Sequence, residues 1–555
     1  MINNLFLNID AGTIDWSRAQ FALTAIYHWL FVPLTLGLAV IMGIAETKYY
    51  RTKDEFWKTA AKFWQKLFGV NFAMGVATGI ILEFEFGTNW SNYSWFVGDI
   101  FGAPLAVEGI VAFFMESTFV AVMFFGWKKV SPGFHLASTW LTGLGATISA
   151  WWILVANAWM QYPVGCEFNP DTMRNEMVSF AEVALSPFAI DKFCHTVISS
   201  WIIGAIFCVA VCCWYLMKRR ETKLATESMK IGAWVGLIAA LLAGATGHKS
   251  AQSVAEVQPM KLAAMEALYN GGTDQGLSVV AWVNPFCQPD YETEKSAPMK
   301  LEMPYALSFM ATDDFHGYVP GINDILNGYV KADGTIEPSV DEKISRGKQA
   351  IAALKAYREA KFASSDDGST AEANLKILKE NMKYFGYGYI KDKHDIVPFI
   401  PVNFWAFRIM VGLGCLFIVY FALLLLMIYK VPYISIIIRR LLATVGILPE
   451  TAADTEGISG LPAWHYWAAI VMVPLAYIAS ESGWLVAEFG RQPWTIQDML
   501  PTWAAVSDLN AGSVALTFIL FLILFTTMLA VEINILLKQI KKGPDHEYER
   551  INDKG

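Results

Sequence analysis

The residues of this sequence that could do chemistry are ionisable side chains inside long apolar runs. Such a side chain is costly in a membrane-spanning helix unless it is paired or has a function. A search through each run finds a small set of these residues: His28, Glu108, Glu116, His195, Arg408, Glu481 and Glu488. Histidines in such places are typical ligands of metal or haem iron, and carboxyls are typical proton carriers, so both kinds of chemistry are candidates.

His195 and Met410 share a predicted depth in the membrane. His195 lies eight residues after Pro187, and Met410 lies nine residues after Pro401. Both prolines stand where a helix is expected to begin, so both side chains should lie about 12–14 Å from their helix ends. A histidine and a methionine at one depth could bind a single low-spin haem iron from opposite faces. The alternative for Met410 is a packing residue, because methionine commonly fills irregular gaps in a core.

Glu108 and Glu116 lie on one predicted helix, eight residues apart. This spacing places Glu116 about 12 Å deeper and about 80° further round the helix. Two carboxyls in this arrangement could form a proton relay. Alternatively, one carboxyl could lie beside an iron while the other relays protons. The alternative is a structural pair of buried carboxyls that hydrogen-bond to their neighbours.

Arg491 follows Glu488 within the short run 488–494, just beyond an apolar segment. A cation at this place could neutralise a haem propionate. It could equally anchor the segment at the lipid headgroups. The residues alone leave both interpretations open.

Nine apolar runs must position these side chains. Of the 555 residues, 55% are hydrophobic and only 17% are charged, compared with roughly 25% charged residues in an average soluble domain. Met1–Arg18 has no basic segment before the first run, which predicts a retained first helix. We predict an all-α integral membrane protein with nine transmembrane helices. The runs lie at 18–44, 67–82, 104–126, 135–158, 187–217, 230–247, 401–429, 465–487 and 512–537.

Basic residues predict how the nine helices are oriented. They gather after the first, third, fifth, seventh and ninth runs, whereas 83–103 has none and 160–186 has only Arg174. Because basic loops stay in the cytoplasm, the N-terminus is expected outside and the C-terminus in the cytoplasm. The basic residues are Lys48, Arg51, Lys53, Lys58, Lys62, Lys128, Lys129, Lys218, Arg219, Arg220, Lys223, Lys430, Arg439, Arg440, Lys538, Lys541 and Lys542.

One polar connection, residues 248–400, is far longer than the others. Ser339 with Glu342 and Ser369 with Glu372 are typical of helix starts. A structureless connection of this length would be unusual, so we predict an ordered extracytoplasmic loop domain, with an inert insertion as the alternative. The predicted division of the chain is 1–247 (helices 1–6), 248–400 (loop domain) and 401–555 (helices 7–9 and a tail). Whether Cys166 and Cys287 form a disulfide is left open.

Several segments resemble subunit I of the cytochrome bd quinol oxidases, in the order of that family and over nearly the whole chain. The segments are 18–24 (RAQFALT) leading to His28, 98–109 (GDIFGAPLAVEG), 114–118 (FMEST), 152–157 (WILVAN), 257–258 with 261–266 (KLAAME), and 490–494 (GRQPW). The long polar connection resembles the long-loop branch of the family. The resemblance implies a subunit of a terminal oxidase that oxidises quinol and reduces O2 to water.

The resemblance also implies haem ligands. His195 and Met410 would be the axial ligands of a low-spin haem b, with Arg408 and Arg491 binding the cofactors. His28 and Glu488 would be the proximal ligands of two high-spin haems, a haem b and a haem d. Which haem belongs to which ligand is left open, as is whether a b-type haem takes the place of haem d.

Roles in quinol oxidation and proton transfer follow in the same way. Gln258, Lys261 and Glu266 would bind and oxidise quinol at the outer face. Glu108 would lie at the oxygen-reducing haem pair. Glu116, Ser149 and Asn157 would form a proton path from the cytoplasm, so that the enzyme would generate a proton motive force without pumping.

The partners implied by the resemblance are quinol, O2, membrane lipid, a second large membrane subunit (subunit II) and a small single-span subunit. The expected place is the bacterial cytoplasmic membrane, and no nucleic acid is expected as a partner. Ubiquinol and menaquinol are not distinguished. Two other classes stay open on the residues alone: a transporter or channel with intramembrane ionisable groups, and a haem electron carrier that does not act on oxygen.

Overall fold

The computed structural model describes residues 10–362, 369–429 and 463–545. Within these residues, nine helical segments are long and apolar enough to cross a membrane, which confirms the predicted fold class. Each predicted run falls on one of them. The segments are α1 (Ala11–Thr52), α2 (Glu55–Thr88), α4 (Asp99–Val107) continuing through η2 (Glu108–Phe113) into α5 (Phe114–Phe125), α6 (Pro132–Gln161), α8 (Pro187–Met217), α9 (Thr222–Val257), α15 (Ile400–Ile428), α17 (Ala463–Phe489) and α19 (Ala511–Lys542).

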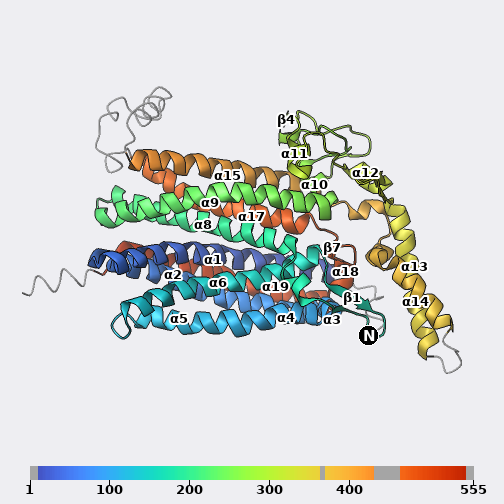
Figure 1. Cartoon of the computed structure of the whole chain (residues 1–555), viewed down its shortest axis with the longest axis horizontal. Helices are drawn as coiled ribbons and strands as arrows, with labels where there is room; N and C mark the ends of the chain where they lie inside the picture. The colour runs from blue at the N-terminus through green and yellow to red at the C-terminus, as the bar shows by residue number, and fades with distance from the viewer. Residues whose placement is uncertain (1–9, 363–368, 430–462, 546–555) are drawn as a thin grey trace, which may run out of the picture.

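The helices form one bundle with two dissimilar ends (Figure 1). We call the end that carries the connection between α9 and α15 the loop end, and the opposite end, where α1 joins α2 and α8 joins α9, the turn end. The predicted basic residues after spans one, three, five and nine belong to the turn end, for example Arg51 in the last turn of α1 and Lys541 in the last turn of α19. Lys430, Arg439 and Arg440 lie outside the described residues. The charge pattern therefore separates the two ends, and the cytoplasmic side of the turn end stays a prediction.

The third span begins earlier than the sequence predicted. Pro104 was expected in the first helical turn, but α4 begins at Asp99 and contains Pro104 in its interior. The helix then widens into the π-helical segment η2, which begins at Glu108. A proline removes a backbone hydrogen bond, and π-helical segments are frequent at functional sites. The carboxyl of Glu108 thus lies at the point where the backbone of the third span departs from the regular α-helix.

Short elements cover the loop end. They are α3 (Ser91–Val97), the hairpin of β1 (Cys166–Asn169) and β2 (Arg174–Met177), α7 (Phe180–Ala184), α10 (Pro259–Glu266), the pair β3 (Leu277–Val280) and β4 (Leu301–Met303), α11 (Ala306–Thr312), α12 (Ile322–Asn327), the pair β5 (Tyr329–Val330) and β6 (Ile336–Glu337), α13 (Val340–Phe362), α14 (Ser369–Asn381), η3 (Met382–Tyr389), η4 (Lys393–Ile396), the pair β7 (Trp494–Ile496) and β8 (Leu500–Pro501), and α18 (Thr502–Ala505).

The long connection packs on the bundle through a shared apolar core. Leu262 of α10, Ile322 of α12 and Tyr387 of η3 belong to one buried cluster with Phe404 of α15. Ser339 caps α13 as predicted, because its Oγ accepts a hydrogen bond from the backbone N–H of Glu342 at 3.3 Å. The sixth helix, α9, continues to Val257, ten residues beyond the predicted boundary at 247. The connection is therefore an ordered part of the fold that begins with α10.

Cys166 and Cys287 are both free cysteines, so the two residues form no disulfide in the structure.

α1 and α8 cross in close contact at two glycines. A Cβ atom added to Gly37 would lie 2.6 Å from the Cα of Gly204, so neither position has room for a side chain. His28 lies nine residues before Gly37, and His195 lies nine residues before Gly204. Both helices run from the loop end to the turn end. The crossing therefore places the two histidines at the same distance, about 13.5 Å, on the loop side of one contact point.

Replacement of Gly204 by leucine tests this crossing. The new side chain would meet the backbone of α1, and overpacking of this kind costs about 1–3 kcal/mol. We expect Gly204→Leu to lower the midpoint of thermal unfolding of the purified protein by several degrees. Gly87→Leu is the matched control, because a Cβ at Gly87 meets no atom of the described residues within 4 Å. Equal midpoints for the two variants would contradict the tight crossing.

Candidate functional site

One face of α6 holds the two carboxyls of the third span. Ser131 caps this helix with its hydroxyl, and Pro132 occupies its first turn, as expected for a helix start. Ser149 donates a hydrogen bond from Oγ to Oε1 of Glu108 at 2.6 Å. One turn closer to the turn end, a Cβ added to Gly145 would lie 2.9 Å from Cγ of Glu116. The structure thus brings the predicted residues Glu108, Glu116 and Ser149 together along α6.

The same face continues toward the loop end. Asn157 donates from Nδ2 to Oε1 of Glu488 on α17 at 3.0 Å. One turn further, Oε1 of Gln161 accepts a hydrogen bond from Nζ of Lys261 on α10 at 2.7 Å. Positions 145, 149, 157 and 161 of α6 are separated by multiples of four, so they form a row that turns by about 40° round the helix axis for every four residues. We call this row of positions the α6 row.

Three cations surround Glu488 at the end of the α6 row. Arg491 forms an ion pair with Oε2 of Glu488 at 2.6 Å and donates to the backbone oxygen of Thr495 at 2.8 Å. Lys192 donates to Oδ1 of Asn157 at 3.3 Å, and Lys261 is 2% exposed. Nε of Arg491 is buried and has no hydrogen-bond partner within the described residues. The cluster therefore offers several N–H donors and suits an anionic group such as a propionate.

Lys192 is the residue of this cluster that the sequence search missed. It lies three residues before His195, inside a predicted run, and was therefore an ionisable group of the kind that the search sought. Gln161 was missed as well. Its position four residues after Asn157 on the same helix could have identified it.

His28 and His195 both have the environment of iron ligands. Nδ1 of His28 lies 2.9 Å from Oγ1 of Thr78 on α2, and Nδ1 of His195 lies 3.2 Å from Oγ1 of Thr246 on α9. A ligating histidine typically binds the metal with one ring nitrogen while a hydrogen bond at the other orients the ring. Nε2 is then the nitrogen that each ring would present to iron, so both residues fit a haem.

Glycines keep the space beside the candidate ligands open. A Cβ added to Gly79 would lie 3.0 Å from Cε1 of His28, and one added to Gly247 would lie 3.2 Å from Cε1 of His195. The sulfur of Met410 on α15 has the same kind of neighbour, because a Cβ added to Gly483 of α17 would lie 3.1 Å from it. Both α8 and α15 pack against α9 and α17. His195 and Met410 therefore belong to one group of four helices, as a ligand pair for one haem requires.

Arg408 and Glu266 contact each other, although the sequence assigned them to different groups. Arg408 forms an ion pair with Oε2 of Glu266 at 2.7 Å and donates from Nε to the backbone oxygen of Ser278 at 3.1 Å. Burial raises the pKa of Glu266, and the charge of Arg408 opposes this rise. The guanidinium thus joins α15 to α10 and β3, and its predicted contact with a haem stays a prediction.

Lys261 and Glu266, predicted for one quinol site, point into different surroundings. Burial, together with the charge of Lys192, lowers the pKa of Lys261 well below its ordinary value. Lys261 and Gln258 line a cavity of about 180 Å³ at the loop end, whereas Glu266 is not among its lining residues. The two residues lie five positions apart on α10, which separates them by about 140° round the helix. The cavity is therefore a candidate binding site that includes only part of the predicted quinol set.

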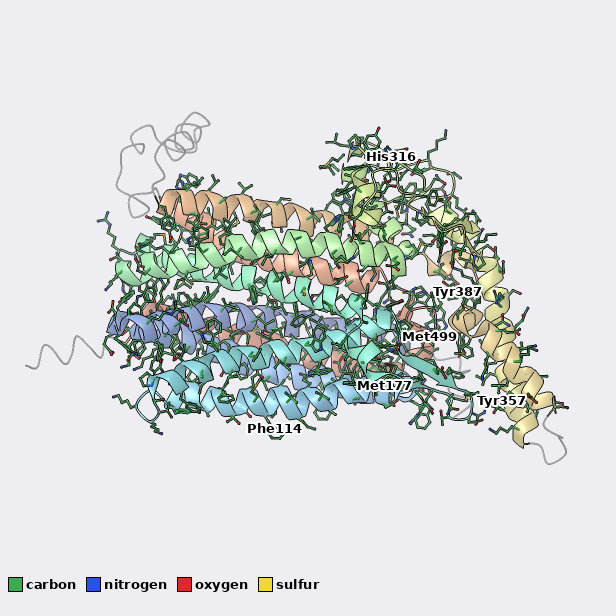
Figure 2. The ribbon with its side chains drawn as sticks, in the orientation of Figure 1. Phe114, Met177, His316, Tyr357, Tyr387 and Met499 are labelled. Carbon is green, nitrogen blue, oxygen red and sulfur yellow. The ribbon has the colours of Figure 1, made fainter. Side chains whose placement is uncertain are left out.

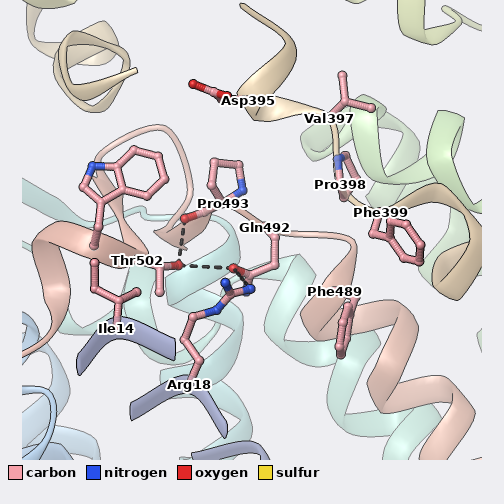
Figure 3. A pocket seen from close by; sticks show the side chains of 11 residues that line it. Ile14, Arg18, Asp395, Val397, Pro398, Phe399, Phe489, Gln492, Pro493 and Thr502 are labelled. Carbon is pink, nitrogen blue, oxygen red and sulfur yellow. Dashed lines mark hydrogen bonds between the residues drawn. The ribbon is translucent and has the colours of Figure 1, made fainter. Parts of the chain in front are cut away.

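A second cavity of about 180 Å³ lies beside the start of α1 (Figure 3). Arg18 donates to Oε1 of Gln492 at 3.3 Å, and Thr502 donates to the same atom at 3.2 Å. Gln492 lines both cavities and separates them.

His135 and Glu481 also lie within the bundle. His135 is 2% exposed, contacts Oε1 of Glu46 at 2.6 Å, and contacts the backbone oxygen of Met123 at 3.0 Å. Both ring nitrogens of His135 are thus used in hydrogen bonds that join α6 to α1 and α5. Oε1 of Glu481 is buried and has no hydrogen-bond partner within the described part of the chain.

Comparisons with known proteins bear on this arrangement. Residues 16–544 match the family model "Cytochrome bd terminal oxidase subunit I". The chain is 40% identical to cytochrome bd-II ubiquinol oxidase subunit 1 of Escherichia coli K12, over 96% of this chain and 97% of the relative. It is 34% identical to cytochrome bd ubiquinol oxidase subunit 1 of Bacillus subtilis 168, over 96% and 94%. The bd oxidase structure from Geobacillus thermodenitrificans has the same fold, with a TM-score of 0.71, 20% identity, and coverage of 96% and 99%.

Proposed function

The chain belongs to the cytochrome bd terminal oxidase subunit I family, and from this premise we propose that it is the haem-bearing subunit of a quinol:oxygen oxidoreductase in a bacterial cytoplasmic membrane. The observation that supports this function best is the α6 row. It joins the cavity of Lys261 to Glu488, and it holds Glu108 and Glu116 further along the same helix. One helix thus contacts residues for quinol binding, haem binding and proton transfer.

His195 and Met410 would hold a low-spin haem b from opposite faces. His28 and Glu488 would be the single protein ligands of two high-spin haems, a haem b and either a haem d or a second haem b. Bound haems supply one-electron transfer and, where an axial position is open, oxygen binding. The protein's part is to orient the ligands, and Asn157 and Arg491 do so for Glu488 by hydrogen-bonding both carboxylate oxygens.

The basic side chains around Glu488 support the same proposal. Lys192, Lys261 and Arg491 offer N–H donors to anionic propionates at the loop end. The unpartnered Nε of Arg491 has a donor left for such a group, and an anionic cofactor would hold the lysines in their charged form. Arg408, held by Glu266 on one side, would contribute its charge to the low-spin haem.

Quinol would bind in the cavity lined by Gln258 and Lys261. Lys261 can hold a quinol oxygen by a hydrogen bond, and its lowered pKa favours the neutral amine, which can accept a proton. Glu266, on the other side of α10, would act through the hydrogen bonds that hold this helix. The relatives named above act on ubiquinol, and the choice between ubiquinol and menaquinol stays open for this chain.

Protons for oxygen reduction would travel along the α6 row. Glu116 would receive them from the cytoplasmic side, and Glu108 with Ser149 would carry them toward the haem ligands. Asn157 would extend the path to Glu488. With the N-terminus outside and the C-terminus in the cytoplasm, quinol oxidation releases protons outside and water formation consumes protons from inside. Charge is then separated across the membrane without a pump.

Partner subunits would cover part of the bundle surface. The third and ninth spans are the least buried of the nine helical segments in the described chain, and residues such as Phe114 (Figure 2) and Ile523 are largely exposed. Lipid and a second large membrane subunit would pack on these faces, because the relatives are each one subunit of a larger oxidase. A small single-span subunit completes the proposed assembly.

A reduced-minus-oxidised optical spectrum of the purified complex tests the function. We expect a low-spin haem b band together with a haem d band or a second high-spin b signal. A protein without haem signals would be a transporter or channel. A single low-spin haem would indicate an electron carrier that does not reduce oxygen. Either of these spectra would reject the proposal.

Replacement of Met410 by leucine tests the ligand pair. Leucine has a similar volume but no donor atom, so the low-spin haem should become high-spin. We expect the low-spin band to disappear from the reduced spectrum while total haem is largely retained. Met229→Leu is the matched control, because Met229 is a buried methionine of α9. An unaltered low-spin band in the Met410 variant would exclude Met410 as a ligand.

Replacement of Glu116 by glutamine tests the proton path. Glutamine keeps the size and hydrogen bonding of the side chain but cannot carry a proton. We expect intact haem spectra and oxygen consumption slowed about 10- to 100-fold. Glu227→Gln is the control, because Glu227 is paired with Lys230 near the turn end of α9. Normal turnover in the Glu116 variant, with intact haems, would rule out this role.

A further inference from the structure

The cavity that contains Lys261 has a second polar group that the proposed function does not use. Lys261 and Gln258 of the α10 region form the first group. Gln497 and Asp498, in the turn between β7 and β8, and Tyr387 in η3 line the same cavity as a polar group next to Gln258. Figure 2 shows Tyr387 and Met499 at the loop end, beside the long connection. A ring with two oxygens at opposite positions requires a polar partner for each oxygen.

An unbroken series of hydrogen bonds joins the two groups. Nζ of Lys261 donates to Oε1 of Gln258 at 2.7 Å, and Nε2 of Gln258 donates to Oε1 of Gln497 at 3.0 Å. Nε2 of Gln497 donates to Oδ1 of Asp498 at 3.0 Å, and the hydroxyl of Tyr387 donates to the same oxygen at 2.9 Å. All five residues line the cavity. Asp498 is therefore an acceptor at the far end of the series from Lys261.

Asp498 is held firmly in its place. Its backbone has a positive φ of 60°, which aspartate and asparagine tolerate better than most residues. Its backbone oxygen accepts a hydrogen bond from the N–H of Gly386 at 3.0 Å. Burial raises the pKa of the Asp498 carboxyl, and the charge of Lys343 opposes this rise. Burial thus makes the carboxyl of Asp498 a better proton acceptor than an exposed aspartate.

A line of charged groups leads from Asp498 to the surface. Lys343, whose side chain is 8% exposed, forms an ion pair with Oε1 of Glu337 at 2.6 Å. Lys331, whose side chain is 46% exposed, binds Oε2 of the same carboxylate at 3.0 Å. Glu337 itself lines the cavity. Asp498 therefore shares its cavity with a carboxylate whose second partner, Lys331, is partly exposed to solvent.

From this geometry we propose that Asp498 is a catalytic residue of quinol oxidation, which accepts the proton of one quinol hydroxyl and passes it outward by way of Glu337. The proposal rests on the proposed function. One O–H bond of the quinol breaks and its proton goes to the carboxylate of Asp498. The second hydroxyl, hydrogen-bonded at Lys261, gives its proton to the neutral amine of Lys261, which becomes an ammonium group. The two electrons leave in the oxidase reaction, and the product is the quinone with two C=O bonds.

The neighbouring cavity at Arg18 lacks these features (Figure 3). The carboxyl at its rim belongs to Asp395, which is exposed. It therefore offers no buried proton acceptor.

Replacement of Asp498 by asparagine in the complete oxidase tests the proposal. Asparagine tolerates the same backbone conformation and keeps an acceptor for Tyr387. We expect oxygen consumption driven by a short-chain quinol to fall about 100-fold. With tetramethyl-p-phenylenediamine, which donates an electron without releasing a proton, the rate should equal that of the unaltered enzyme. Asp498→Glu should restore part of the quinol activity with a shifted pH profile.

Asp508→Asn is the matched control, because Asp508 is an exposed aspartate of the same connection. Equal quinol rates for Asp498→Asn and Asp508→Asn would overturn the proposal. So would an equal loss with both electron donors, since it would indicate general damage. Failure of the unaltered enzyme to oxidise quinol would reject the proposed function instead.

Tyr387→Phe provides a second test if Asp498→Asn does not assemble. It removes only the hydroxyl that donates to Asp498. We expect quinol turnover to fall about 10-fold, with a shifted pH profile and an unchanged rate with the proton-free donor. An unaltered pH profile and unaltered quinol turnover would overturn the proposal.

Discussion

The ion pair of Glu488 with Arg491 is the interaction on which the arrangement at the loop end depends. A carboxylate in this place must be fully hydrogen-bonded, because an unpaired buried charge is strongly destabilising. Its partners come from different parts of the chain: Asn157 from α6 and Arg491 from the connection after α17. Lys192 of α8 joins them through Asn157. A single half-buried charge therefore gathers three helices and a turn around one point.

The α6 row connects the ion pair of Glu488 with polar residues at other depths of the bundle. A repeat of four residues keeps successive side chains on one face of a helix, at the cost of a slow rotation round its axis. Ser149, Asn157 and Gln161 use this spacing to reach a carboxyl, a second carboxyl and an amine on three other elements. The polar contacts are thus ordered along the membrane normal by helix geometry, with no need for a separate channel structure.

The sequence predicted the nine spans well because long apolar runs and their flanking charges are local signals. It placed Pro104 wrongly, since a proline near a helix start does not show how many residues precede it. It could not show that Arg408 pairs with Glu266, or that Lys261 and Glu266 diverge, because both facts depend on where α10 packs. Asp498 was missed for a similar reason. Its burial arises from contact with η3, more than a hundred residues earlier in the chain.

The glycine crossing of α1 and α8 has a mechanical consequence. The two backbones touch at Gly37 and Gly204. This contact therefore acts as the pivot for any tilt of α1 relative to α8. His28 and His195 lie on arms of equal length, and a relative tilt of about 10° would change the spacing of arms of about 13.5 Å by about 2 Å. Packing against neighbouring helices sets the tilt of a membrane helix. The fit of two glycines at one crossing thereby helps to set the distance between the side chains of His28 and His195.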